Sequence, residues 1–316
     1  MRVLVTGSTG FLGRRVTQAL LQRDMEVRCL VHTPGREEVL GDAPVEVYYG
    51  DVTDPAALRA SMYQVDAVVH LAAIIREGWG KSFERVNTEG TRNLASVSRE
   101  RGVAHLVHVS NVGVRNNPQY PFLRSRWLAE QEVMRSGLPY TIIRSSVLFG
   151  EGDEFMNTLA AVVRFSPVVP VPGWGKTLFQ PIAVEDAARC IAAAVGDDAL
   201  IGETVELGGP EHLTYREMVD LIARVYGVRR IWCPVPVPLL RVAARLMETV
   251  LPRPPVTSRQ LDCLSVDNTT ELDVVERAFG FSPKRLEDGV QYTGRVSYWD
   301  AWRILLGAMP RHIRDH

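Results

Sequence analysis

The first half of the chain alternates short apolar runs with longer stretches of helical periodicity. Six runs rich in β-branched residues predict strands, and most are apolar at consecutive positions, as strands buried on both faces are. This alternation predicts a doubly wound α/β class, with a parallel sheet, right-handed crossovers and helices on both faces. The predicted strands are Val3–Thr6, Val27–Val31, Val45–Tyr49, Ala67–Leu71, Leu106–Ser110 and Thr141–Arg144, and the helices between them are Phe11–Arg23, Pro55–Met62, Thr88–Arg101 and Ser125–Ser136.

The second half changes character and is interrupted by prolines. Prolines punctuate the stretch 167–181, around Gly173-Trp174-Gly175, and predict a loop-rich segment. Thr214 and Glu217 have the spacing of a capping box, and the apolar positions that follow recur on one face of a helix up to Val225.

Composition and charge exclude several classes of protein. With 46% hydrophobic and 23% charged residues, the chain has the balance of an ordinary soluble globular protein. A formal net charge of -1 gives no global electrostatic reason to bind nucleic acid or an anionic membrane. No apolar run reaches the ~18–20 residues of a membrane helix, and Met1 leads straight into a strand-like run, so neither a transmembrane segment nor a signal peptide is expected.

The cysteines give no sign of a metal or disulfide framework. Cys29, Cys190, Cys233 and Cys263 form no CxxC pair, and no cluster of histidines accompanies them. We therefore expect no metal site, and a reducing cytoplasmic location fits this usage.

A glycine loop, Gly7-Ser8-Thr9-Gly10-Phe11-Leu12-Gly13, follows the first predicted strand and opens the first predicted helix. Glycines at these positions permit a tight turn and let backbone N–H groups approach a pyrophosphate at the positive end of the helix. A plain glycine-rich turn is the alternative, but the position after the first strand favours dinucleotide binding.

With its companion motifs, the glycine loop resembles the short-chain dehydrogenase/reductase superfamily, in its extended and atypical, NAD-dependent epimerase/dehydratase-like branches. The resemblance covers residues 1–290 and rests on 50–54, 66–73, 86–91, 137–144, 180–188 and the pair Ser125 and Glu130. Within the superfamily, 79–93 and 208–238 resemble the group that includes the nucleotide-binding accessory subunit of respiratory complex I. The resemblance implies a Rossmann fold.

The resemblance also implies which residues hold the cofactor. The pyrophosphate would be lined by the glycine loop, the adenine flanked by the turn after the third strand, and the adenosine carried on the segment after the fourth. Asp51 could instead cap a turn, and 71–73 could be plain core. The implied contacts are Gly7, Thr9, Gly10, Phe11, Leu12 and Gly13 for the pyrophosphate, Asp51 and Val52 for the adenine, and Leu71, Ala72 and Ala73 for the adenosine side.

The turn after the second strand favours NADP, with NAD as the alternative. An NAD site usually has an acidic side chain there for the ribose 2′-hydroxyl, and 30–36 contains none. His32, Arg36 or Arg14 could face a 2′-phosphate instead, because guanidinium groups match phosphate geometry.

The usual catalytic pair of the superfamily, Tyr-x-x-x-Lys, is absent. In the register set by Ser125 and Glu130, Phe122 stands for the tyrosine and Arg126 for the lysine. Arg126 could still bind ribose hydroxyls but cannot act as a neutral base. A second register pairs Tyr120 with Arg124, but it contains a proline and loses the other spacing.

Two functions follow from this missing pair. The first is an NAD(P)-dependent oxidoreductase with other proton donors, acting on an unknown small molecule. Its tentative catalytic residues are Ser110, Asn111, Tyr120 and Arg126, with His108 and Arg144 as further candidates. The second is a non-catalytic NADP(H)-binding structural or redox-sensing subunit.

The resemblance predicts two domains. Residues 1–165 form the Rossmann domain, its sheet completed from 180–210, and 166–316 form a smaller substrate or lid region. The amphipathic stretch 239–251 is expected to pack over the substrate cleft, while a peripheral membrane or partner role stays open. Trp299, Trp302 and 310–316 are expected to be a surface appendage that docks or forms an oligomer contact.

Overall fold

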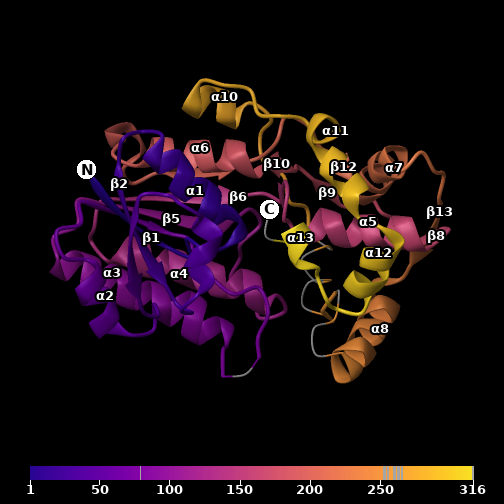
Figure 1. The fold of residues 1–316 in the computed structure, drawn as a ribbon, viewed down its shortest axis with the longest axis horizontal. Coiled ribbons are helices and arrows are strands. Elements are labelled where there is room, and N and C mark those ends of the chain that lie inside the picture. The colour runs from indigo at the N-terminus through magenta and orange to yellow at the C-terminus, as the bar shows by residue number, and fades with distance from the viewer. Residues whose placement is uncertain are drawn as a thin grey trace. The chain divides into compact units, whose positions relative to one another are not determined.

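The computed structural model describes residues 1–78, 80–251, 254, 256–258, 261, 264 and 266–314, so Trp79, Cys263 and the last two residues of 310–316 lie outside the described residues. The chain divides into two compact units (Figure 1). Unit 1 comprises Met1–Ser145 and Val184–Leu207, and unit 2 comprises Ser146–Ala183 and Gly208–His316. The described parts contain no helix long and apolar enough to cross a bilayer.

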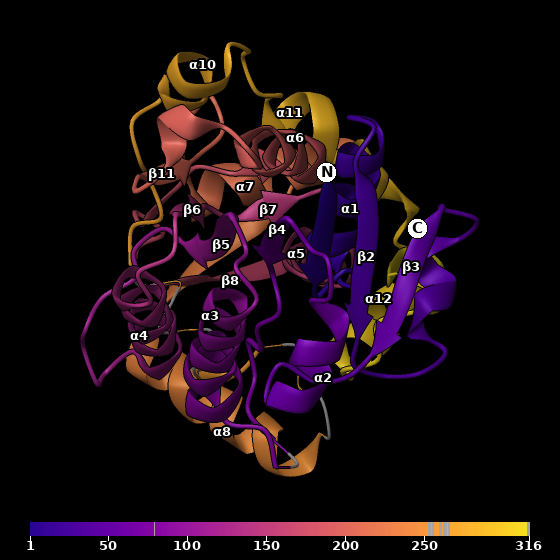
Figure 2. The same ribbon diagram turned by 90° about the vertical axis from the view of Figure 1, so that its left-hand side faces the viewer.

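Unit 1 is built on a seven-stranded sheet in the order β11-β6-β5-β4-β1-β2-β3, and every pairing in it is parallel. Figure 2 shows β5, β4, β1, β2 and β3 side by side. The doubly wound class is confirmed, and all six predicted strands are present. The strands are β1 (Arg2–Thr6), β2 (Glu26–Val31), β3 (Val45–Tyr49), β4 (Ala67–His70), β5 (His105–Asn111), β6 (Tyr140–Ser145) and β11 (Thr204–Leu207).

Helices cover both faces of this sheet. Helices α1 (Phe11–Leu21) and α6 (Val184–Ala194) pack together on one face. The other face carries α2 (Pro55–Ser61), the π-helical η2 (Glu84–Glu89), α3 (Gly90–Glu100) and α4 (Pro121–Arg135) (Figure 1). Short 3₁₀ turns η1 (Arg36–Leu40) and η3 (Asp198–Leu200) complete the unit.

Helix α4 begins at Pro121, so the predicted start at Ser125 is wrong. Proline is well suited to the first position of a helix, because its fixed φ fits and its missing N–H would have had no helical partner. Tyr120 is therefore the N-cap residue, and Phe122 and Arg126 lie one turn apart on the same helix.

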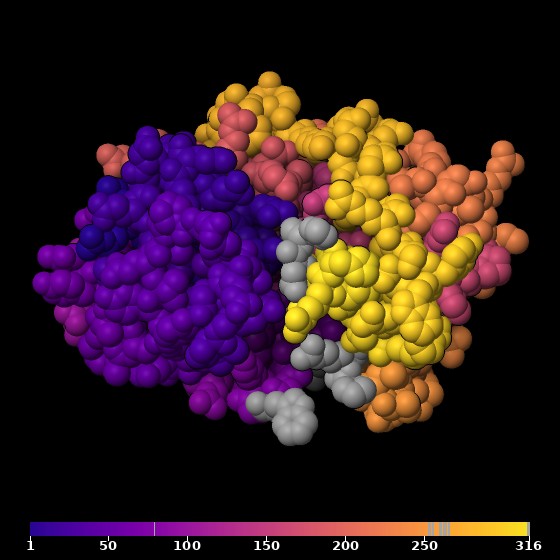
Figure 3. All heavy atoms as spheres, in the orientation of Figure 1, coloured from indigo at the N-terminus to yellow at the C-terminus, as the bar shows by residue number. Residues whose placement is uncertain are grey.

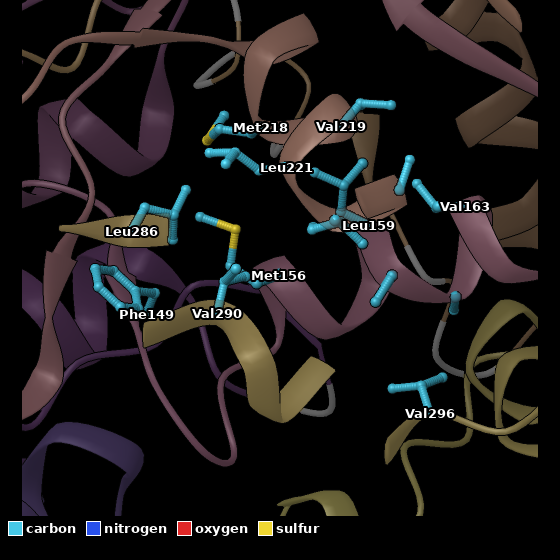
Figure 4. Packing of buried hydrophobic residues seen from close by; sticks show 14 of the residues in the cluster. Phe149, Met156, Leu159, Val163, Met218, Val219, Leu221, Leu286, Val290 and Val296 are labelled. Carbon is cyan, nitrogen blue, oxygen red and sulfur yellow. The ribbon is translucent and has the colours of Figure 1, made fainter. Parts of the chain in front are cut away.

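Unit 2 is a separate helical assembly with three two-stranded sheets. Figure 4 shows its core, where Met156 and Leu159 of α5 pack with Met218 of α7 and with Leu286 and Val290. The strands are β7 (Leu148–Phe149), β8 (Val168–Pro172), β9 (Leu178–Phe179), β10 (Ile182–Ala183), β12 (Leu213–Thr214) and β13 (Ile231–Val235), and the helices are α5 (Phe155–Phe165), α7 (Tyr215–Val225), α8 (Val237–Val250), α10 (Val274–Phe279), α11 (Leu286–Gly289), η4 (Val290–Arg295), α12 (Tyr298–Leu305) and α13 (Arg311–Arg314).

The predicted start of α7 is confirmed. Thr214 accepts a hydrogen bond from the backbone N–H of Glu217, and the Glu217 side chain accepts one from the backbone of Thr214. This capping box satisfies backbone donors that a helix start leaves without helical partners.

The two surface expectations for unit 2 have different outcomes. Helix α8 does not bury the apolar side of 239–250, since Ala244 is the one buried residue of that helix. Trp299 and Trp302 are exposed at the surface, as expected, but α12 packs against α5 and buries Ala301 and Ile304, so it is part of unit 2 and not an appendage. In both helices, apolar side chains point outward.

A buried carboxyl precedes α5. Asp153 is 3% exposed, and its carboxylate accepts hydrogen bonds from the backbone N–H of Met156 (2.6 Å) and from the Tyr292 hydroxyl. Burial raises the pKa of Asp153 to about 7, although these donors favour the charged form.

This pKa predicts how stability depends on pH. An unfolded Asp titrates near ~3.9, so between pH ~4 and ~7 the folded state binds the proton more tightly, and the free energy of unfolding falls as pH rises through that window. Asp153→Asn stays neutral and keeps an acceptor oxygen. We expect urea unfolding to show the variant gaining stability relative to the wild type between pH 5 and 8. Parallel pH profiles for the two proteins would contradict this expectation.

Candidate functional site

The glycine loop between β1 and α1 requires glycine for a specific steric reason. Gly7 has a φ of 76°, a left-handed conformation that side chains rarely adopt, and its carbonyl accepts from the N–H of Gly10 at 3.0 Å. A Cβ on Gly13 would lie 2.0 Å from that same carbonyl oxygen. The start of α1 therefore sits directly against the backbone of the loop.

The start of α1 fits a diphosphate. The first backbone N–H groups of a helix have no helical partner, and the N-cap residue Gly10 supplies no side-chain cap. No acidic residue lies in the first turn to compete for these donors. A pyrophosphate binds to free backbone N–H groups at the positive end of a helix. The glycines of the loop leave these N–H groups accessible, because they carry no side chains.

The segment after β4 lies beside the glycine loop. Leu71 donates its backbone N–H to the carbonyl of Thr6 (3.1 Å), and a Cβ on Gly7 would lie 2.9 Å from the nitrogen of Ala72. Strand order reverses between β1 and β4, and such a switch point opens a crevice at the carboxyl ends of the strands. Leu71, Ala72 and the exposed Ala73 therefore line the expected place for the adenosine side.

The turns after β2 and β3 meet at His32. Its Nε2 lies 3.0 Å from Oδ2 of Asp51 and 3.1 Å from Nζ of Lys81. Asp51 also accepts from the N–H of Thr53 (2.8 Å), so it caps a turn, as the alternative interpretation has it. Lys81 was not among the candidates, because nothing in the sequence links it to a residue so far away in the chain.

The two remaining cofactor candidates in this region lie differently. Arg36 is exposed at the start of η1, on the same turn after β2 as His32. Val52 is 6% exposed in the core of unit 1, and it fills the space that a Cβ on Gly90 would occupy. Packing against Gly90 accounts for the burial of Val52, and its contact with adenine stays a prediction.

Arg126 and Asn111 form the centre of the catalytic candidates. Arg126 of α4 is 3% exposed; it donates from Nε to Oδ1 of Asn111 (3.2 Å) and from Nη2 to the carbonyl of Val109. Burial lowers its pKa to about 10, which leaves it a cation at neutral pH. Its Nη1 is buried and has no partner within the described residues, so one donor is left for an acceptor oxygen.

The aromatic residues near this pair do not supply a phenol to it. The ring of Phe122 packs edge-on against Phe83, with centroids 5.7 Å apart. Tyr120 lies beneath the guanidinium of Arg115, 5.5 Å from the ring centroid, and no hydrogen bond joins its hydroxyl to the described chain. Tyr120 is thus not brought together with Arg126.

Two buried histidines, His70 and His108, lie on the neighbouring strands β4 and β5. His70 of β4 is hydrogen-bonded to the hydroxyls of Thr6 (2.7 Å) and Thr91 (2.9 Å), and its ring is 5.2 Å from that of His108. Burial, with the Arg126 cation, lowers the pKa of His70 to about 3 and that of His108 well below its usual value. Both rings are therefore neutral. Neither ring nitrogen of His108, nor the hydroxyl of Ser110, has a partner in the described part of the chain.

Arg144 belongs to an ion-pair network and is not a free donor. It holds Glu130, which is fully buried on α4, through Nε–Oε1 and Nη2–Oε2 contacts of 2.9 and 2.8 Å. A third contact of 3.1 Å joins Arg144 to Glu206 of β11. The hydrogen bonds that Arg144 donates to Glu130 raise the pKa of Arg144, and the Glu130 charge also favours the cationic form of Arg126.

Comparison with known proteins places the chain in one family and gives relatives with different names. The model of the NAD dependent epimerase/dehydratase family matches residues 3–208. The chain is 32% identical over 243 residues to the mouse mitochondrial NADH dehydrogenase [ubiquinone] 1 alpha subcomplex subunit 9, covering 74% of this chain but only 63% of that protein. It is 30% identical to the ceramide reductase of Caulobacter vibrioides, covering 78% of this chain and 77% of the reductase.

Solved structures share the fold. The Citrobacter sp. triphenylmethane reductase complexed with NADP(H) superposes with a TM-score of 0.75 at 20% identity, covering 92% of this chain and 99% of that one. Identity at this level shows the fold alone.

Proposed function

This chain belongs to the NAD dependent epimerase/dehydratase family, and on that premise we propose that it binds NADP(H) in preference to NAD(H) and acts as an oxidoreductase without a Tyr-x-x-x-Lys pair. The family is NAD(P)-dependent. One observation carries the proposal: the Gly7–Gly13 loop has no room for a Cβ at Gly13, so helix and loop backbones together form the diphosphate cradle.

Cationic side chains at the far end of this cradle support the preference for NADP. At the turn where an NAD site would place a carboxylate, Arg36 begins η1, and Nζ of Lys81 lies 3.1 Å from Nε2 of His32. Asp51, the acid nearby, is engaged by His32 and by a backbone N–H. A 2′-phosphate would be met by positive charge there.

Lys81→Gln tests this preference. Removing one cation that faces a phosphate should weaken NADPH binding about tenfold and leave NADH binding within about twofold, since NADH carries no 2′-phosphate. Fluorescence titration with both nucleotides measures the two dissociation constants, and Lys176→Gln in unit 2 is the matched control. An equal loss for both nucleotides would mean that Lys81 acts on folding or on another part of the cofactor.

In the proposed reaction the protein orients and stabilises charge. Bound nucleotide supplies or accepts the hydride. Nη1 of Arg126 is a buried donor with no partner among the described residues, so we assign it to an acceptor oxygen of cofactor or substrate, while Asn111 and the Val109 carbonyl fix the guanidinium in place. A buried cation stabilises a developing oxyanion far better than one in water does.

Hydride transfer from NADPH to a panel of ketone, aldehyde and quinone acceptors tests the oxidoreductase proposal. The Caulobacter vibrioides relative is named a reductase, which supports this direction. We expect wild-type turnover, a loss of at least about a hundredfold in kcat for Arg126→Met, and no loss for Arg124→Met, whose arginine is exposed on the same helix. Full activity in Arg126→Met would remove Arg126 from the site.

A second candidate function is a non-catalytic NADP(H)-binding subunit. The observation that favours it is the position of Phe122 against Phe83, where the superfamily has its phenol, together with the separation of Tyr120 from Arg126. The mouse relative is named as a subunit of a larger complex. Nucleotide binding that raises the melting temperature, without hydride transfer to any acceptor in the panel, would favour this function over the first.

A further inference from the structure

Helix α8 presents its apolar side to solvent. Leu239, Val242, Leu246 and Val250 recur at helical spacing and are 60%, 54%, 64% and 78% exposed, whereas Ala244 is buried on the opposite side. In a helix that covers a core, the apolar side is buried and the polar side faces solvent. Isolated exposed apolar residues are common on proteins, but a continuous outward stripe marks an interaction surface.

Helix α12 repeats the arrangement with aromatic residues. Trp299 and Trp302 are 64% and 43% exposed, and their rings stack with centroids 5.0 Å apart. Ala301 and Ile304 occupy the buried side against α5. Figure 1 shows α8 below α12, and Figure 3 shows the orange atoms of α8 at the lower edge of unit 2.

The segments that contain these helices carry an excess of positive charge. Residues 229–251 contain four arginines and one acidic residue, Glu248, and 295–314 contain four arginines and one acidic residue, Asp300, although the whole chain has a net charge of -1. Asp300 is buried and accepts hydrogen bonds from Ser297, so it offers little negative charge to a partner. Arg245 is exposed and flanks the apolar stripe of α8.

We propose that the exposed sides of α8 and α12, together called the α8/α12 surface and formed by Leu239, Val242, Leu246, Val250, Trp299 and Trp302, dock unit 2 onto an anionic phospholipid membrane. Aliphatic side chains would enter the acyl boundary, tryptophans would sit at the headgroup level, and arginines would pair with lipid phosphates. With 14 residues, α8 is about 21 Å long, which suits a helix lying in the interface and falls short of the hydrocarbon thickness.

Vesicle flotation of the full chain tests this proposal, with phosphatidylcholine vesicles that either contain or lack phosphatidylglycerol. We expect binding to the anionic vesicles only, weakened by added salt because the arginine contribution is screened. Leu239→Glu/Leu246→Glu should reduce binding at least about tenfold, since both side chains would have to be buried to bind. Leu272→Glu, at a leucine that is 49% exposed in unit 2 outside this surface, should leave binding unchanged.

Three results would overturn the proposal. The first is no flotation of the wild type with anionic vesicles, and the second is equal flotation of Leu239→Glu/Leu246→Glu and wild type. The third is a dimer in solution that becomes monomeric on the same double substitution, which would assign the surface to a second copy of the chain. Melting temperatures of all variants confirm that they fold, and the test is independent of nucleotide binding.

Discussion

Gly13→Ala should weaken NADPH binding at least about a hundredfold, because the diphosphate cradle cannot form around an added methyl group. The new Cβ would lie 2.0 Å from the carbonyl oxygen of Gly7 and 2.8 Å from the carbonyl carbon of Ser8. Both neighbours are backbone atoms that cannot rotate away, so loop and helix must separate. Isothermal titration calorimetry measures the loss.

The control for Gly13→Ala is Gly202→Ala. Gly202 has a φ of 85°, so alanine there adds backbone strain, but a Cβ at that position meets nothing within 4 Å. We expect Gly202→Ala to lower stability without changing nucleotide affinity. If Gly13→Ala still shows the wild-type rise in melting temperature with NADPH, the loop does not hold the diphosphate.

Glu130→Ala should lower the free energy of unfolding by about 3 kcal/mol, because it leaves the partly buried Arg144 guanidinium without its main counter-charge. In this variant Arg144 still contacts Glu206, and its side chain is 25% exposed to solvent. The expected loss of stability is therefore at the lower end of the range for a broken buried ion pair. Urea unfolding measures the difference.

Two further variants separate the buried pair from ordinary surface charge. Glu130→Leu/Arg144→Leu removes both charges and should recover most of the stability. Glu132→Ala, on the same helix, breaks a pair in which Arg92 is 56% exposed, and should cost less than about 1 kcal/mol. Equal losses for Glu130→Ala and Glu132→Ala would contradict the role given to burial.

Sequence patterns predicted the sheet well because each strand of unit 1 is a local signal. Runs such as Val3–Val5 and Ala67–Val69 are apolar at consecutive positions, which is the pattern of a strand covered on both faces. The glycine loop was also recognisable, because the contacts that require glycine at Gly13 are with Gly7 and Ser8 of the same loop.

Features set by distant contacts were not predictable. Lys81 contacts His32 although the two residues are far apart in the chain, and no sequence pattern links them. The outward turn of Leu239 and Leu246 depends on which side of α8 the rest of unit 2 covers, and amphipathic periodicity is the same for either orientation. The roles of Ser110, Asn111, Tyr120 and Arg126 stay predictions, although contact between Asn111 and Arg126 now gives two of them a shared position.

Calorimetric titration of the wild-type protein with NADPH and then with NADH tests the central claim most directly, which is that backbone amides at Gly7–Gly13 hold a dinucleotide diphosphate. We expect saturable binding of both nucleotides at one site per chain, with the tighter constant for NADPH. No measurable heat with either nucleotide, from protein shown to be folded, would contradict the claim.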